Sequence, residues 1–109
     1  MIPTSRGIYI TAHLFIDKDI KLSDVKNAYE DFYKDSKFVR LRTSAPHLNQ
    51  VLGSNFCDIS ITLRGRTLVL NAATDNLIKG MCGTAIQNLN LISGFEESLG
   101  LLNSAMGPV

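Results

Sequence analysis

The chain has 109 residues, which is enough for a single domain over 1–109 and too few for two. Hydrophobic residues make up 45% and charged residues 19%, a composition that predicts a packed core and excludes a disordered chain. Eleven Lys and Arg residues against ten Asp and Glu give a net charge of +1, so the charge balance favours neither nucleic acid nor an anionic membrane as a partner.

The first part of the chain predicts a strand followed by a helix. Residues Gly7–Ile16 are rich in β-branched and aromatic side chains, a run typical of a strand covered on much of both faces. Ser23 is the expected N-cap of the next element, with Asp24 in its first turn. Five apolar residues then recur at helical spacing and predict an amphipathic helix with one buried face. They are Val25, Ala28, Tyr29, Phe32 and Tyr33.

The middle of the chain predicts a short strand, a loop and a β-hairpin. Phe38–Arg42 reads as the short strand and Thr43–Asn55 as the loop. A strict alternation then predicts a half-buried strand. Its apolar face is Cys57, Ile59, Ile61 and Leu63, and its polar face is Asp58, Ser60, Thr62 and Arg64. Gly65 supplies the turn into a second strand, Thr67–Ala73.

The last part predicts a long helix that Asp75 caps. Its apolar side is Leu77, Met81, Ala85, Leu89 and Ile92. Gly80 and Gly83 lie inside this helix, where glycine is unfavourable, so we expect another segment to pack closely against that turn. Gly94 ends the helix, and Phe95–Leu101 allows a further short one. The order of elements predicts an α+β fold, with a mixed, largely antiparallel sheet covered by helices.

Several residues could carry chemistry, and each has a simpler structural interpretation. His13 lies within a strand pattern, which favours a structural role over a catalytic base. His47 follows a proline in a loop, and no carboxylate or cysteine stands near it in sequence. Cys57 shares a face with isoleucines, where cysteine behaves as a small hydrophobe. Cys82 would be reactive only if a cation such as Lys79 lowered the pKa of its thiol.

No complete active site follows from these residues. The glycines of Gly80-Met81-Cys82-Gly83 lie inside a helix, whereas phosphate-binding glycine loops precede one, and the sequence has neither a dinucleotide fingerprint nor a metal-ligand cluster. Two cysteines make no disulfide scaffold. No apolar run approaches the roughly 18 residues of a spanning helix, and the first residues lack a secretory pattern. We expect a cytoplasmic protein that binds neither nucleic acid nor a membrane.

Four segments, taken in order, resemble the N-acetyl-gamma-glutamyl-phosphate reductase family. They are Pro3–Ile8, Pro46–Val51, Gly53–Ile59 and Asp75–Asn90. The most specific blocks are Gly53-Ser54-Asn55 and the run from Asp75 to Gly80, read together at this spacing. The likeness extends over nearly all of the chain but over only about the last third of such an enzyme.

The resemblance implies a two-domain enzyme. An N-terminal Rossmann domain holds most of the NADP, and a second α+β domain, like the C-terminal domain of glyceraldehyde-phosphate dehydrogenase, serves substrate binding and dimerisation. Such an enzyme reduces N-acetylglutamyl phosphate to the semialdehyde in arginine biosynthesis, through a cysteine thioester. The nucleophilic cysteine and the basic histidine both belong upstream of this chain. We therefore expect no catalytic residue here, no activity of this chain alone, and the Rossmann domain and further copies as partners.

Two residues carry the expected sites, and no metal site is expected. Arg6 is the candidate for substrate binding, because a planar guanidinium suits an anionic group; the alternative is a backbone anchor beside Gly7. Asn76 is the candidate for cofactor binding, because its amide complements a nicotinamide carboxamide; the alternative is a turn residue.

The sequence also departs from the family at several positions. Asn49 stands where lysine is common, and Met81 and Cys82 stand where small residues are common. They put in doubt any charge contact carried over from the loop at Asn49 and indicate a repacked helix face at Met81 and Cys82. Two other functions stay open. One is a sister reductase that acts on an aminoadipyl or aspartyl phosphate, and the other is a non-catalytic oligomerisation module.

Overall fold

Four strands form a mixed sheet in the computed structural model, which describes residues 3–106. The strand order is β1-β4-β3-β2, with β1 and β3 antiparallel to β4 and β2 parallel to β3. The strands are β1 (Ile8–Phe15), β2 (Val39–Arg42), β3 (Cys57–Arg64) and β4 (Thr67–Thr74). The helices are α1 (Leu22–Tyr33), a 3₁₀ turn (Leu48–Gln50), a π-helical turn (Ile78–Cys82) and α2 (Gly83–Ile92). The α+β class and the order of elements are confirmed.

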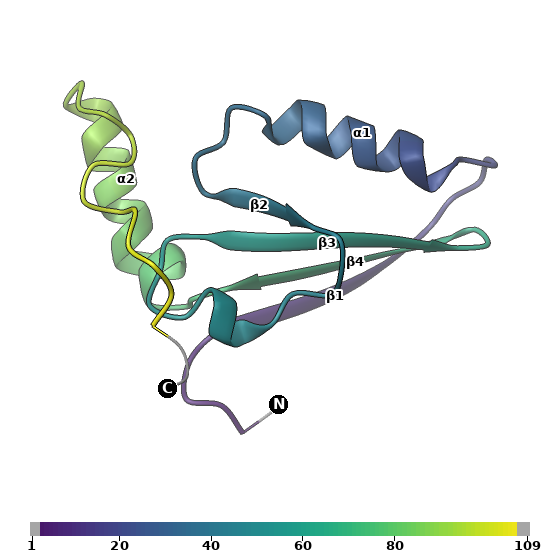
Figure 1. Cartoon of the computed structure of the whole chain (residues 1–109), viewed down its shortest axis with the longest axis horizontal. Helices are drawn as coiled ribbons and strands as arrows, with labels where there is room; N and C mark the ends of the chain where they lie inside the picture. The colour runs from purple at the N-terminus through teal and green to yellow at the C-terminus, as the bar shows by residue number, and fades with distance from the viewer. Residues whose placement is uncertain (1–2, 107–109) are drawn as a thin grey trace.

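Helix α1 covers one face of the sheet over β2 and β3 (Figure 1). The buried core beneath it consists of Ile59, Ile61 and Leu68, and the partly buried side chains of α1 pack against them. Ser23 is not the N-cap: the helix begins at Leu22, where the carbonyl of Lys21 accepts from the amides of Asp24 and Val25.

The apolar stripe of α1 is wider than the surface it meets. Phe32, expected to be buried, is 79% exposed, and Ala28 is exposed as well. Helix α1 packs mainly over β2, β3 and the core below them, so the exposed part of the stripe lies beyond that contact.

The polar face of β3 is buried along its first half, which corrects the half-buried prediction. Asp58 and Ser60 are as inaccessible as Ile59 and Ile61 on the opposite face. The side chain of Arg40 covers Asp58 and reaches the carbonyl of Gln50 in the preceding loop, at 2.9 Å. Alternation of residue types does not reveal burial when charged side chains themselves form the cover.

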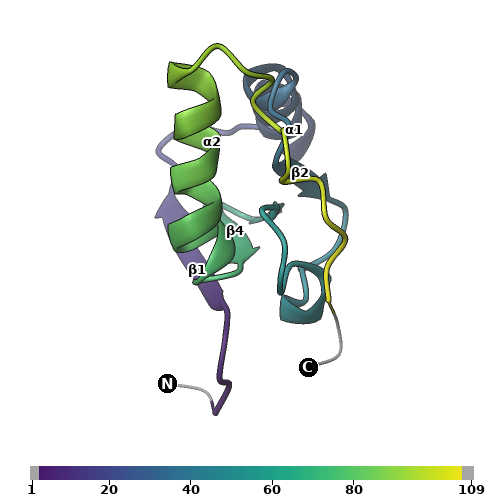
Figure 2. The same cartoon turned by 90° about the vertical axis from the view of Figure 1, so that its left-hand side faces the viewer.

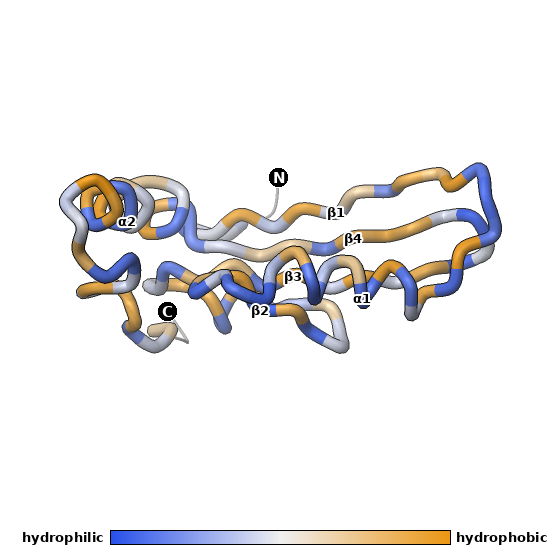
Figure 3. The backbone as a smooth tube through the Cα atoms, turned by 90° about the horizontal axis from the view of Figure 1, so that it is seen from above, coloured by the Kyte–Doolittle hydropathy of each residue, from blue (hydrophilic) through white to orange (hydrophobic). Residues whose placement is uncertain are grey.

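Strand β1 is not covered on both faces within the described residues. All its residues except Ala12 are exposed, because β1 lies at the edge of the sheet and no described helix packs on it. Figure 3 shows this edge as a largely hydrophobic tube.

The C-terminal helix stands at one end of the sheet (Figure 2). It starts as the π-helical turn and continues as α2. Gly94, with φ +72°, ends it as expected, but the described part of 95–101 contains turns and no helix. No helix among residues 3–106 has the length and hydrophobicity to cross a bilayer.

The close approach predicted at the two helix glycines is present at Gly83 only. A Cβ atom at Gly83 would collide with Oδ1 of Asn55 and lie 2.8 Å from the carbonyl oxygen of Ile78. A Cβ atom at Gly80 would meet nothing nearer than the carbonyl oxygen of Asp75, at 3.5 Å.

Alanine substitutions at Gly83 and Gly80 therefore form a matched pair that tests the close contact. Gly83→Ala should lower the unfolding free energy by about 1–3 kcal/mol, because overpacking at Asn55 outweighs the better helix propensity of alanine. Gly80→Ala should leave it unchanged or raise it by up to about 1 kcal/mol. Urea denaturation of both variants measures the two effects. Equal stability of the two variants would contradict the close contact at Gly83.

Candidate functional site

The buried carboxylate of Asp75 ties together three distant segments. Its side chain is 0% exposed and lies where β4 passes into the helix. Oδ2 accepts from a terminal nitrogen of Arg6 and from the amide of Gly53, both at 2.7 Å. Oδ1 accepts from the amides of Leu77 and Ile78, at 2.7 and 2.9 Å. The expected capping role of Asp75 is confirmed, and the same group also fastens the start of β1 and the loop before β3.

These contacts decide the ionisation of Asp75. Burial raises the pKa of its carboxyl group, but the amides of Gly53, Ile78 and Leu77 and the guanidinium of Arg6 lower it by more. The pKa of Asp75 therefore lies below its ordinary value. The carboxylate is negative at neutral pH and faces the guanidinium as a fixed charge.

Arg6 uses only some of its N–H donors to bind Asp75. One terminal nitrogen forms the ion pair, while the buried Nε has no hydrogen-bond partner within residues 3–106. The side chain is 27% exposed and borders a hollow of about 600 Å³. A guanidinium offers five N–H donors, so Arg6 can hold Asp75 and still present donors to an anion.

Asn76 lies in the same hollow as Arg6. Its Oδ1 accepts from the amide of Gly7 at 2.7 Å, so the residue holds the start of β1 next to the start of the helix. Its Nδ2 donates no hydrogen bond within the described residues. The structure thus brings together the two residues singled out from the sequence. The hollow is lined by Thr4, Ser5, Arg6, Gly7, Tyr9, Leu48 and Asn76.

A second polar cluster lies between α2 and the loop before β3. Gln87 accepts from Lys79 Nζ at 2.7 Å and from Asn55 Nδ2 at 3.3 Å, and it donates to Glu97 at 2.7 Å. Burial lowers the pKa of Lys79, although Cys57 and Glu97 oppose the shift. The sequence pattern does not connect these residues, although Asn55 lies in the Gly-Ser-Asn block and Lys79 and Gln87 lie in the Asp75–Asn90 segment.

The structure does not assemble a nucleophile from the other candidates. Burial raises the pKa of the Cys57 thiol, with a further rise from Asp58, so Cys57 is not a ready thiolate. Cys82 is exposed, and its Sγ lies 3.0 Å from the carbonyl oxygen of Leu77. Lys79, the cation considered for Cys82, instead binds Gln87 and lies over the ring of Phe38.

The two histidines stand apart from both clusters. His13 is exposed on edge strand β1, and His47 is exposed in the loop before the 3₁₀ turn. Within the described part of the chain, neither imidazole hydrogen-bonds to a cysteine or a carboxylate. No group of three or more potential metal ligands occurs among residues 3–106.

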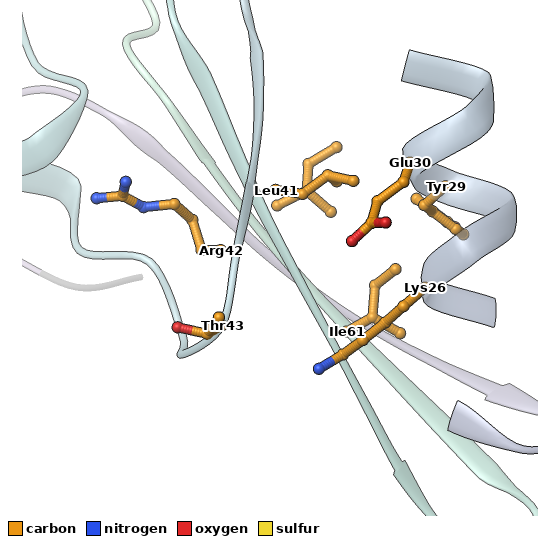
Figure 4. A pocket seen from close by; sticks show the side chains of 8 residues that line it. Lys26, Tyr29, Glu30, Leu41, Arg42, Thr43 and Ile61 are labelled. Carbon is orange, nitrogen blue, oxygen red and sulfur yellow. The ribbon is translucent and has the colours of Figure 1, made fainter. Parts of the chain in front are cut away.

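A smaller cavity lies under α1 (Figure 4). It measures about 110 Å³, and its floor is formed by Leu41, Ile59 and Ile61. The side chain of Arg42 points away from it and pairs with Asp58 at 3.2 Å. The charged side chains of Lys26 and Glu30 also line this cavity. Because it is much smaller than the hollow that both Arg6 and Asn76 line, that hollow is the candidate site.

Comparisons with known proteins identify the family of the chain. The family model described as "Semialdehyde dehydrogenase, dimerisation domain" matches residues 1–76. Proteins named N-acetyl-gamma-glutamyl-phosphate reductase align along the chain. That of Methanosarcina barkeri is 46% identical over 99% of this chain and 33% of its own length. Those of Lactococcus lactis and Archaeoglobus fulgidus are 45% and 47% identical, over 93% and 97% of this chain.

The matched region is only a part of each relative. The chain spans about a third of the length of these reductases. The family model alone covers well over half of the chain, and its match ends at Asn76, inside the Arg6–Asp75–Asn76 cluster. The chain therefore belongs to the semialdehyde dehydrogenase dimerisation domain family.

Proposed function

We propose that this chain is the dimerisation-domain part of a cytoplasmic, NADP-dependent reductase that converts N-acetylglutamyl phosphate to N-acetylglutamate semialdehyde in arginine biosynthesis. The observation that carries the proposal is the 45–47% identity, over at least 93% of the chain, to reductases of that name. In the balanced reaction, the acyl phosphate, NADPH and a proton give the aldehyde, NADP⁺ and inorganic phosphate.

In this proposal, Arg6 binds an anionic group of the substrate. Asp75 is a positioning residue, because its buried carboxylate fixes the guanidinium at the hollow from one side. The exposed part of the side chain supports the role, since the guanidinium donors that Asp75 leaves free on that side can clasp a phosphate or carboxylate.

Asn76 orients the cofactor in the same proposal. Its carbonyl oxygen accepts from the amide of Gly7, and the residue lines the hollow, where its Nδ2 is to donate to a carboxamide oxygen. When bound, the nicotinamide supplies hydride. The rest of the cofactor, the nucleophilic cysteine and the basic histidine are supplied by a Rossmann domain and upstream residues of the same polypeptide. A second copy of the polypeptide is the expected oligomerisation partner.

The direct test compares the complete polypeptide with the 109-residue chain. The complete polypeptide should oxidise NADPH and release phosphate in equal amounts when given N-acetylglutamyl phosphate, whereas the 109-residue chain should do neither. Aminoadipyl and aspartyl phosphates should be poorer substrates. Preference for one of those, or turnover by the purified 109-residue chain alone, would overturn the assignment.

Replacing Arg6 by lysine in the complete enzyme tests substrate binding. A lysine can keep one charge contact to Asp75 but loses the forked donors, so KM for the acyl phosphate should rise about tenfold, on the scale of one charge-assisted hydrogen bond. The thermal midpoint should change little. Arg64→Lys, at the exposed end of β3, is the matched control. A lowered midpoint with unchanged KM would make Arg6 a backbone anchor only.

Two substitutions at Asn76 separate cofactor binding from the turn. Asn76→Ala removes the donor and the acceptor and should weaken NADPH use by roughly threefold to tenfold, the value of one neutral hydrogen bond. Asn76→Asp keeps an acceptor for the Gly7 amide but loses the donor, so it should weaken NADPH use while preserving stability. Asn88→Ala, exposed on α2, is the control. Normal cofactor kinetics in both variants would leave Asn76 as a turn residue.

A further inference from the structure

One edge of β1 has no hydrogen-bond partner within the described residues. The amide of Ile16 donates to the carbonyl of Arg66 at 2.9 Å, and the antiparallel register between β1 and β4 continues from that pair without a break. Alternation along an antiparallel ladder therefore directs the N–H and C=O groups of even-numbered residues toward β4. Those of the odd-numbered residues point to the open edge. The outward residues are Tyr9, Thr11, His13 and Phe15.

This edge lacks the sequence features that keep exposed edge strands from pairing with other strands. Natural edge strands carry proline, lysine, other charges or a bulge, or are short. Strand β1 has eight residues, contains no proline, lysine, arginine or carboxylate, and pairs with β4 over its whole length without a bulge. Its composition is therefore that of an inner strand and not of a protected edge strand.

The side chains of β1 point to the same conclusion. Ile10 pairs with Ala72 and Leu14 with Leu68, so both lie on the sheet face that α1 covers farther along. They are 51% and 47% exposed, because α1 packs mainly over β2 and β3, away from this edge of the sheet. Figure 3 shows β1 as a hydrophobic border on the side of the sheet opposite α1 and β2. Apolar side chains of this kind belong against a further packed segment.

We infer that β1 is an inner strand of the complete protein, where a β-strand from the part of the polypeptide outside these 109 residues pairs with its open edge. The inference rests on the proposed function, in which the chain is about a third of a longer enzyme. A strand of about six to eight residues matches the length of β1. It carries apolar side chains at alternate positions, on the face of Ile10 and Leu14.

A covalently linked strand is a better occupant than a second copy of β1. Linkage within one polypeptide supplies an effective concentration in the millimolar range, whereas separate copies at micromolar concentration must find each other. The intramolecular strand therefore occupies the edge first.

Amide hydrogen exchange of the complete polypeptide tests this pairing residue by residue. The outward amides of Tyr9, Thr11, His13 and Phe15 should exchange on the order of 100-fold or more slowly than in an unpaired chain, as their inward neighbours do. The inward amides of Ile10, Ala12 and Leu14 are the control within the same strand. Fast exchange that alternates with slow exchange along β1 would overturn the inference.

Nuclear Overhauser contacts identify the occupant in the same sample. Contacts from the outward β1 amides to protons outside the 109 residues are expected. Contacts between the β1 strands of two copies, seen after mixing labelled and unlabelled polypeptide, would overturn the intramolecular pairing. Reductase activity is measured in parallel. If the polypeptide is active but exchange alternates along β1, the strand pairing is wrong and the proposed reaction stands. If protection is uniform but the polypeptide is inactive, the proposed reaction is wrong and the strand pairing stands.

Discussion

The carboxylate of Asp75 is the point where the start, middle and end of the chain meet. Moving an ionised carboxylate out of water costs several kcal/mol, and the cost is offset only if its oxygens are fully hydrogen-bonded. Here three backbone amides and one guanidinium do this. Because each donor comes from a segment whose position depends on the others, the start of β1, the Gly53 loop and the helix start form one unit. This unit positions Arg6 and Asn76 and so determines the shape of the hollow that they line.

A second buried carboxylate, inside the sheet, is held by two arginines, although its Oδ2 has no hydrogen-bond partner within the described residues. Asp58 is fully buried on the polar face of β3, with Arg40 at 2.5 Å and Arg42 at 3.2 Å. The arginine side chains cover the carboxylate with their aliphatic stems and hold it with their nitrogens. Breaking such a pair by removing one partner is far more costly than the pair's own net contribution. The parallel contact of β2 with β3 therefore depends on charge as well as on apolar packing.

Local patterns in the sequence were sufficient for most elements of the fold. Alternation from Cys57 and the turn at Gly65 predicted the hairpin, and helical spacing predicted α1, because both signals arise between residues that are neighbours in one element. The errors at Phe32, Asp58 and β1 share one cause. Each concerns what covers a residue, and cover is supplied by segments far away in the sequence.

The same distinction holds for the candidate site: single residues could be selected from the sequence, but their contacts with distant segments could not. Resemblance to a family selected Arg6 and Asn76, and the structure brings them to one hollow. No periodicity predicted that Asp75 holds Arg6, since 69 positions separate the two residues. The cluster around Gln87 was missed for the same reason, because Asn55, Lys79 and Glu97 come from three separate segments.

The pairing of β1 with β4 also means that β1 is synthesised well before its partner strand. Ile8 pairs with Thr74 and Phe15 with Thr67, so the ribosome makes β1 more than 50 residues before its partner. At about 5–20 residues per second, this interval lasts roughly 3–13 s. The β3–β4 hairpin, by contrast, closes within microseconds of emerging, on the order of 1–10 μs. A nascent chain thus carries an uncharged, β-prone segment for seconds before β4 exists, and that segment is where a chaperone is most needed.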